Sequence, residues 1–138
     1  MNVKPMVLFN GQCEEAFKRY EKQLGGRITM MTYFEGTPAA DQTPPGWRRK
    51  VLHARLKIGE GFLLGSDAPP GHYAAPQGFF VSLSVATASE AERLFATLCE
   101  SGRVQSAMQE TFFATRFGMT IDRFGVPWVV VCERPESR

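Results

Sequence analysis

The side chains able to bind a metal or move a proton are few in this chain. It has two histidines, His53 and His72, and the carboxylates of most interest beside them are Asp67 and Asp122. Imidazole and carboxylate bind zinc and other divalent metals, but a site needs three or four such ligands together. His53 and Asp67 are expected on neighbouring strands, and His72 is expected in an exposed loop among proline and glycine. This spacing favours a hydrogen-bonded histidine on a half-buried strand over a metal centre.

The cysteines indicate neither a nucleophile nor a disulfide framework. Cys13, Cys99 and Cys132 are odd in number and far apart, and none lies in a C-x-x-C pair. The chain has no G-x-S-x-G turn for a hydrolase serine and no G-x-G-x-x-G turn for a dinucleotide. Three unpaired cysteines fit a reducing compartment, so a cytoplasmic protein is expected.

Residues suited to a ligand pocket gather late in the chain. Arg116 alternates with Phe117 on an expected strand, so their side chains point to opposite faces. If Phe117 faces the helices, Arg116 faces a cavity, where its guanidinium suits a carboxylate or phosphate. The alternative for Arg116 is an internal ion pair with Asp122 or Glu110. The neighbouring aromatic residues are either pocket walls or core: Phe112, Phe113, Phe117, Phe124 and Trp128.

We therefore expect a set of ligand-binding residues with no metal among them. Its members are His53, Asp67, Gln109, Phe112, Arg116 and Trp128. Ser82 and Ser84 are further hydrogen-bonding groups on the cavity side. Replacing His53, Asp67, Gln109 or Arg116 by alanine is expected to weaken ligand binding and to leave the melting temperature nearly unchanged.

Two helices and eight strands are expected to position these residues. The first helix, over 12–24, has apolar residues on one face and ends at Gly25-Gly26, a typical left-handed stop. The second, over 89–100, begins with a capping-box pattern, Ser89 to Glu92, and ends at Gly102. The expected strands cover 3–9, 27–34, 51–58, 62–66, 79–85, 103–108, 113–121 and 126–133.

The order of these elements repeats, which predicts two modules within one domain of 138 residues. The first module covers 1–70, a linker rich in proline and glycine covers 71–78, and the second module covers 79–134. Gly26-Arg27-Ile28 corresponds to Gly102-Arg103-Val104 at an offset of 76 residues, and the turn at Gly61 corresponds to Gly125 at an offset of 64. The longer loop over 36–49 explains the difference. Each module reads strand–helix–strand–strand–strand.

Several segments resemble a known family and together span nearly the whole chain. They are FNGQCEEAFKRYEKQLGG at 9–26, HARLKIGEGFLLGSDAP at 53–69, SLSVATASEAERLF at 82–95 and QETFFATRFGMTIDRFGVPW at 109–128. The chain is similar to the vicinal oxygen chelate superfamily, which holds glyoxalase I, extradiol dioxygenases and bleomycin- and fosfomycin-resistance proteins. The finer resemblance is to its PhnB-like branch.

The resemblance implies an α+β fold in which two β-α-β-β-β modules form a curled mixed half-barrel sheet, with helices on the convex face. Modules pair within a chain or swap between the chains of a homodimer. On this plan Leu52, Ala54, Leu56 and Ile58 pack under the helices, and His53, Arg55 and Lys57 face the cavity or the dimer seam.

The resemblance also implies where a metal would bind. Metal-using relatives place ligands on four equivalent strand positions, which fall here on Met6, Leu64, Phe80 and Val129. None of these side chains binds a divalent ion, so we expect no metal and no cofactor. Some PhnB-like domains carry a demethylubiquinone methyltransferase label, but this chain lacks the glycine-rich turn that a nucleotide-like cofactor normally needs.

Composition limits the partners of the protein. The net charge is +2 and the densest basic cluster is Arg48-Arg49-Lys50, so nucleic acid is not an expected partner. No apolar run approaches the roughly 20 residues of a membrane helix, and no signal peptide is expected. The leading expectation is a glyoxalase-like homodimer that binds a small organic molecule in a metal-free cavity. The alternatives are a metal-dependent lyase or dioxygenase and an antibiotic-sequestering protein of the bleomycin-resistance type.

Overall fold

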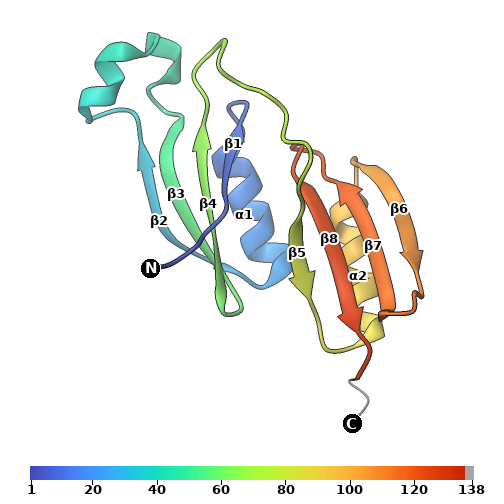
Figure 1. The fold of residues 1–138 in the computed structure, drawn as a ribbon. Coiled ribbons are helices and arrows are strands. Elements are labelled where there is room, and N and C mark those ends of the chain that lie inside the picture. The colour runs from blue at the N-terminus through green and yellow to red at the C-terminus, as the bar shows by residue number, and fades with distance from the viewer. Residues whose placement is uncertain (136–138) are drawn as a thin grey trace. The chain divides into compact units, whose positions relative to one another are not determined.

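Each half of the chain forms one four-stranded sheet with one helix packed against it (Figure 1). This computed structural model describes residues 1–135. The chain divides into two units, Met1–Ala74 and Ala75–Arg138. The sequence therefore predicted the fold class correctly, an α+β fold with two βαβββ modules.

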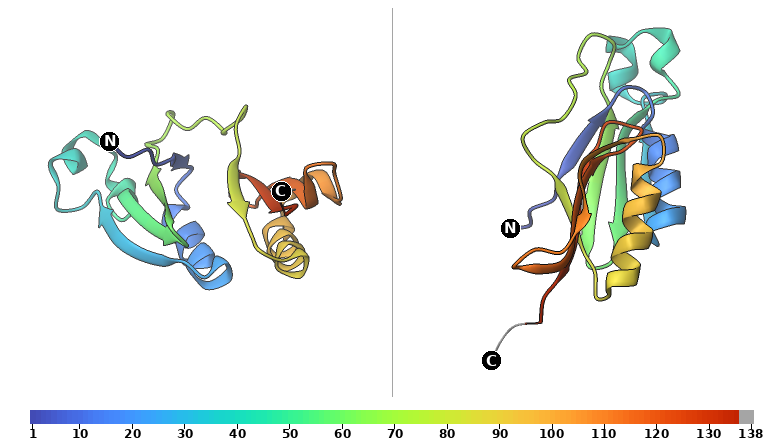
Figure 2. Two further views of the ribbon diagram at one scale, coloured as in Figure 1. Left: turned by 60° about the horizontal axis from the view of Figure 1, so that its bottom comes forward. Right: turned by 90° about the vertical axis from the view of Figure 1, so that its right-hand side faces the viewer.

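The first unit follows the expected order of elements. Its elements are β1 (Met6–Phe9), α1 (Cys13–Leu24), β2 (Arg27–Tyr33), two short 3₁₀ helices (Pro38–Gln42 and Pro45–Trp47), β3 (Val51–Ile58) and β4 (Gly61–Asp67). The sheet has the order β1-β4-β3-β2, with β1 and β4 parallel and the other pairs antiparallel. Figure 2 shows α1 along one face of this sheet.

The second unit repeats this plan. Its elements are β5 (Val81–Ser84), α2 (Ala88–Cys99), β6 (Arg103–Gln109), β7 (Ala114–Ile121) and β8 (Pro127–Glu133). The sheet order is β5-β8-β7-β6, and again only the first pair is parallel. Helix α2 contacts β6, β7 and β8.

The apolar faces of the helices form the centre of each core. Helix α1 buries Cys13, Ala16, Phe17 and Tyr20, and ends at Gly25, whose φ of 74° is the left-handed conformation expected there. Phe17 lies edge-on to Phe9 of β1, with ring centroids 5.9 Å apart. Helix α2 buries Ala91, Leu94, Phe95 and Leu98.

The predicted capping box of α2 is wrong by two residues. Thr87 is the N-cap, and its hydroxyl accepts a hydrogen bond from the backbone N–H of Glu90 at 3.1 Å. Ser89 lies within the first turn instead. Thr87 and Glu90 have the same three-residue spacing as the predicted pair Ser89 and Glu92, so spacing alone does not distinguish them.

An irregularity in β3 changes which side chains face α1. The pairing with β2 skips from His53 to Val51, so Leu52 has no partner in the register. Val51, Ala54 and Leu56 are fully buried, whereas Leu52 is half-buried and lines a cavity. The prediction that Leu52 packs under the helix is therefore wrong, because an unpaired residue inverts the alternation of side chains beyond it.

Candidate functional site

The face of the first sheet that points away from α1 carries the candidate site. On β1, Val7 and Phe9 are buried, while Met6 and Leu8 are 49% and 43% exposed. The register pairs Met6 with Leu64 and Leu8 with Ser66. Because paired residues of adjacent strands project to one face, these four side chains share the face opposite α1.

A cavity of about 310 Å³ lies at the Leu8 end of this face. Its walls are mainly apolar: Leu8, Phe34, Leu52, Ala68 and Pro69, with Ser66, Asp67 and His72 completing the lining. This volume is at the lower end of the range of small-molecule pockets, roughly 300–1,000 Å³. The lining is suited to a small apolar group with few polar contacts.

Asp67 lines this cavity, but its carboxylate is already occupied by the backbone. The side chain is 1% exposed. One oxygen accepts from the backbone N–H of Cys13 at 2.9 Å, and the other accepts from the backbone N–H of Val51 at 2.8 Å. Asp67 thus joins the start of α1 and the start of β3 to the end of β4.

Cys13 is not available as a nucleophile. The thiol is completely buried at the start of α1. Burial, and secondarily the neighbouring Asp67 carboxylate, raise the pKa of Cys13 well above its usual range. Because the thiolate is the reactive form, this residue has a structural role.

The two histidines occupy different environments, as the sequence predicted. His53 is half-buried on β3, opposite Thr32 of β2. His72 is exposed in the loop after β4, where its backbone N–H bonds the carbonyl of Pro69 at 2.9 Å, and its side chain borders the cavity. Its contribution to this lining was not expected from the sequence.

Arg55 is a further candidate that the sequence-based set of ligand-binding residues did not include. It lies on β3 between Ala54 and Leu56, both of which are fully buried on the α1 side, so its side chain projects to the opposite face. Its register partners are Leu64 on β4 and Met30 on β2. The alternation of 51–58 already placed Arg55 on this face, and only the pairing shows that its neighbours are apolar.

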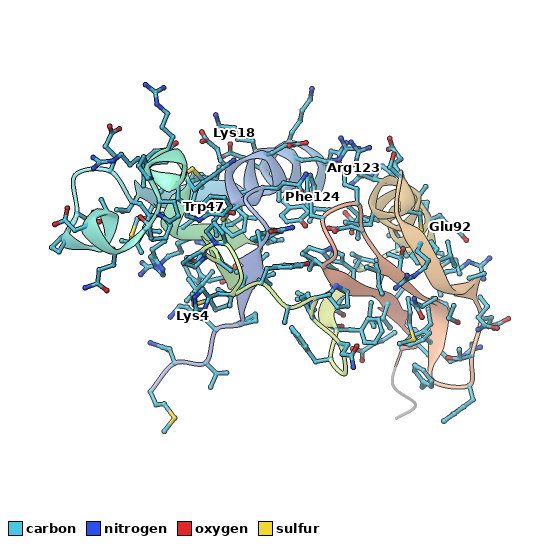
Figure 3. The ribbon with its side chains drawn as sticks, turned by 90° about the horizontal axis from the view of Figure 1, so that it is seen from above. Lys4, Lys18, Trp47, Glu92, Arg123 and Phe124 are labelled. Carbon is cyan, nitrogen blue, oxygen red and sulfur yellow. The ribbon has the colours of Figure 1, made fainter. Side chains whose placement is uncertain are left out.

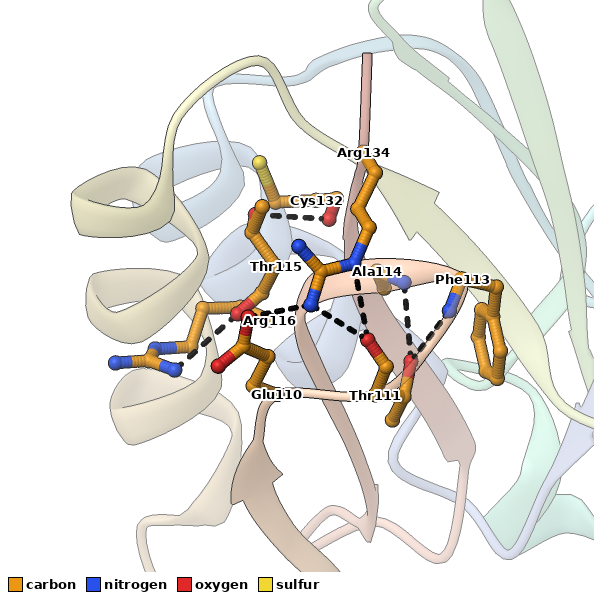
Figure 4. Close-up of polar contacts among 8 residues, drawn as sticks. All are labelled: Glu110, Thr111, Phe113, Ala114, Thr115, Arg116, Cys132 and Arg134. Atoms are coloured by element: carbon orange, nitrogen blue, oxygen red, sulfur yellow. Dashed lines mark hydrogen bonds and ion pairs between the residues drawn. The ribbon is translucent and has the colours of Figure 1, made fainter. Parts of the chain in front are cut away.

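Arg116, in the second unit, points toward α2 and not away from it. Its Nε lies 2.8 Å from a carboxylate oxygen of Glu92, which Figure 3 labels on α2. The guanidinium also donates to the carbonyl of Thr115 at 3.2 Å (Figure 4). The condition for a cavity-facing Arg116, that Phe117 faces the helix, is not met: the helix-facing position is Gly118, since a side chain added there would lie 2.7 Å from the ring of Phe95. Arg116 forms an ion pair, as in the alternative, but its partner is Glu92 and not Asp122 or Glu110.

The other residues predicted for the pocket have three different environments within the second unit. Gln109, at the end of β6, is exposed and donates to the hydroxyl of Ser106 at 3.3 Å. Phe112 is 92% exposed in the loop after β6 and packs edge-on against Phe113. Trp128 is fully buried and its indole N–H donates to the carboxylate of Asp122 at 2.8 Å. Trp128 is therefore a core residue within its own unit.

The loop after β6 is held by backbone and arginine contacts (Figure 4). The hydroxyl of Thr111 accepts from the backbone N–H of Phe113 and of Ala114. Arg134 binds the carbonyl of Thr111 and forms an ion pair with Glu110, which lowers the pKa of Glu110. These contacts order the loop and leave Phe112 projecting into solvent.

The positions implied for a metal have no metal ligands. The register aligns Met6 with Leu64 in the first unit and Ser82 with Val129 in the second. The predicted position Phe80 is wrong, because it precedes β5, and Ser82 is the residue that pairs with Val129. Thioether, hydroxyl and alkyl side chains do not form a site for a divalent ion. In residues 1–135 there is also no group of three or more His, Cys, Asp or Glu side chains that could hold one.

One family of proteins and one relative match nearly the whole chain. The model of the family described as 3-demethylubiquinone-9 3-methyltransferase matches residues 1–131. Protein YjdN of Escherichia coli K12 is 32% identical over 138 residues, covering 94% of each chain.

Three solved structures also match nearly the whole chain. Protein PA1353 from Pseudomonas aeruginosa matches with a TM-score of 0.87 at 43% identity, over 98% of this chain and 99% of that one. The PhnB protein from Bacillus cereus, described as a putative 3-demethylubiquinone-9 3-methyltransferase, has a TM-score of 0.77 at 19% identity, over 96% and 99%. The fosfomycin resistance protein FosX from Mesorhizobium loti has a TM-score of 0.64 at 8% identity, over 97% and 92%. The last two show the fold alone, which is that of the vicinal oxygen chelate proteins.

Proposed function

Because the chain belongs to the 3-demethylubiquinone-9 3-methyltransferase family and has a glyoxalase-like fold, we propose that it binds a small organic molecule in the cavity at the Leu8 end of the first sheet. The observation that carries this proposal is the cavity itself, about 310 Å³ with five apolar residues in its lining. Apolar cavities of about 150 Å³ already bind benzene, so a one-ring compound fits here.

Methyl transfer, which the family description names, is not the activity that this chain supports best. In the α/β folds that hold nucleotide cofactors, the cofactor contacts exposed backbone at a glycine-rich strand-to-helix turn. Gly11 is the single glycine in the two such turns of the chain, and the Trp47 ring lies 3.2 Å from where its side chain would be. Lys50 covers it too and donates to its carbonyl at 2.9 Å. Trp47 and Lys50 therefore cover this turn, and its backbone is not open to a cofactor.

The state of the protein in the cell is part of the proposal. Cys13, Cys99 and Cys132 are all free, which agrees with a reducing compartment, and we keep the cytoplasm as its place. In residues 1–135 no helix is both long and apolar enough to cross a membrane. The expectation of a homodimer stays a prediction, which light scattering of the purified protein tests.

The cavity is tested by titrating the ¹⁵N-labelled protein with benzamide, a neutral one-ring probe. We expect saturable shifts of the backbone resonances of Ser66 and Ala68. Leu8→Trp places a larger side chain at the cavity wall and should abolish these shifts. Met6→Trp is the matched control, because Met6 shares the strand and the face with Leu8 but does not line the cavity. Equal binding by both variants, or no saturable shift in the wild-type protein, contradicts the proposal.

A further inference from the structure

We propose that the molecule bound in this cavity carries an oxyanion, a carboxylate or a phosphonate, and that the Arg55 guanidinium binds it. The inference rests on the proposed function and names its ligand class. Arg55 lies on the sheet face that carries Leu8 and Ser66.

Arg55 has a half-buried side chain whose Nε lacks a hydrogen-bond partner within the described residues. The Nε atom itself is buried. Its cross-strand neighbours, Leu64 and Met30, are apolar. A buried charged donor without a partner is costly, so such a group is expected to have a partner that completes it.

No acidic side chain of the first sheet is free to be that partner. Strands β1 to β4 contain one acidic residue, Asp67, and both of its oxygens accept backbone N–H groups. The other ionisable residues of β3 on this face are His53 and Lys57, and neither is an acid. This face therefore suits an anion supplied from outside the chain.

The second unit shows that the fold does not require an arginine at this position. In the first sheet, one row of paired residues runs Met6, Leu64, Arg55, Met30. The matching row of the second sheet runs Ser82, Val129, Met119, Ser106. Met119 thus occupies the position of Arg55 in the second unit. The fold itself therefore does not require an arginine at this position, and only the first sheet has one there.

Arg55 is also within reach of a ligand in the cavity. The Leu8–Ser66 pair lines the cavity, and the Met6–Leu64 pair, beside Arg55, lies two residues further along the strands. Two residues of a strand span about 6.6 Å, close to the size of a benzene ring with one substituent. A molecule with an apolar body in the cavity can therefore direct a carboxylate or phosphonate toward Arg55.

The test compares benzoate with benzamide, which have nearly the same shape and differ in charge. We expect the wild-type protein to bind benzoate about tenfold or more tightly than benzamide, because hydrogen bonds to charged groups are the stronger ones. Arg55→Met, which copies the equivalent residue Met119, should remove this preference and leave benzamide binding unchanged. Arg116→Met is the matched control: this guanidinium is paired with Glu92, so its loss should leave the preference intact. The affinity of phenylphosphonate, measured in the same way and compared with that of benzoate, shows which of the two oxyanions the site prefers.

The outcomes separate the inference from the proposed function. Equal affinity for benzoate and benzamide in the wild-type protein, or a preference that survives in Arg55→Met, overturns the inference and leaves the cavity proposal standing. If neither compound shifts Ser66 and Ala68, the cavity proposal fails. Titration with inorganic phosphate then tests anion binding by Arg55 without the cavity. A saturable shift of the Arg55 Nε–Hε resonance, identified by its loss in Arg55→Met, supports an anion site. No shift refutes it.

Discussion

Removing the carboxylate of Asp67 should destabilise the first unit strongly. In Asp67→Ala, the buried N–H groups of Cys13 and Val51 both lose their acceptor. Each unsatisfied buried donor costs about 1–3 kcal/mol, so the loss in unfolding free energy should be about 2–6 kcal/mol. Asp67→Asn keeps one acceptor oxygen and should lose about half as much. These values are large against a typical total stability of about 5–15 kcal/mol.

Guanidinium unfolding followed by far-UV circular dichroism measures these losses. Asp41→Asn is the matched control, because Asp41 is exposed in the 3₁₀ helix Pro38–Gln42 between β2 and β3. This variant should stay within about 0.5 kcal/mol of the wild type. If both Asp67 variants are as stable as Asp41→Asn, the two hydrogen bonds do not hold β3 and α1 to β4 as we infer. The outcome we expect is the opposite of the sequence-based expectation that Asp67→Ala leaves the melting temperature unchanged.

Two further changes examine the packing of α1 and its surface charges. Gly65→Ala should cost about 1–3 kcal/mol of unfolding free energy, because the added carbon would lie 2.7 Å from the Phe17 ring. The control is Gly46→Ala, whose added carbon meets no atom within 4 Å and which should be nearly neutral. Equal stability of the two variants would show that α1 can move away from the sheet without cost. Glu14 accepts from Lys18 and from Tyr33, which lowers its pKa below the ordinary 4.5, so its contribution to stability is present above pH 4.5 and is lost as the pH falls through the lowered value. Glu14→Gln should therefore be less stable than wild type at pH 7 and equal to it near pH 3 in chemical unfolding, and a difference that does not depend on pH would refute this assignment.

The sequence predicted what depends on neighbours along the chain. The periodicity of apolar residues in α1 and α2 identified the two helices and their buried faces, because a helix repeats its contacts every three to four residues. Gly25 marked the end of α1 for a reason of the same kind, since a left-handed residue is needed there. The order of elements, with its repeat, then predicted the two modules.

The direction of individual side chains depended on contacts that the chain order does not reveal. The sequence left Arg116 between a cavity and an ion pair with Asp122 or Glu110, and the structure pairs it with Glu92, because Gly118, and not Phe117, accommodates the ring of Phe95. The sequence does not show which of two neighbouring strand positions lies under a helix, since the helix packed against the sheet decides which of the two must be small.

The sequence by itself determined the fold class, the two modules, the absence of metal ligands at Met6, Leu64 and Val129, and the face on which Arg55 lies. Only the tertiary structure decided that the Asp67 carboxylate is used by Cys13 and Val51, that Leu52 leaves the core, and that an apolar cavity forms beside Leu8. The physical reason is distance along the chain. A strand's alternation is local, but its register, its unpaired residues and the partners of a buried charge are set by segments tens of residues away.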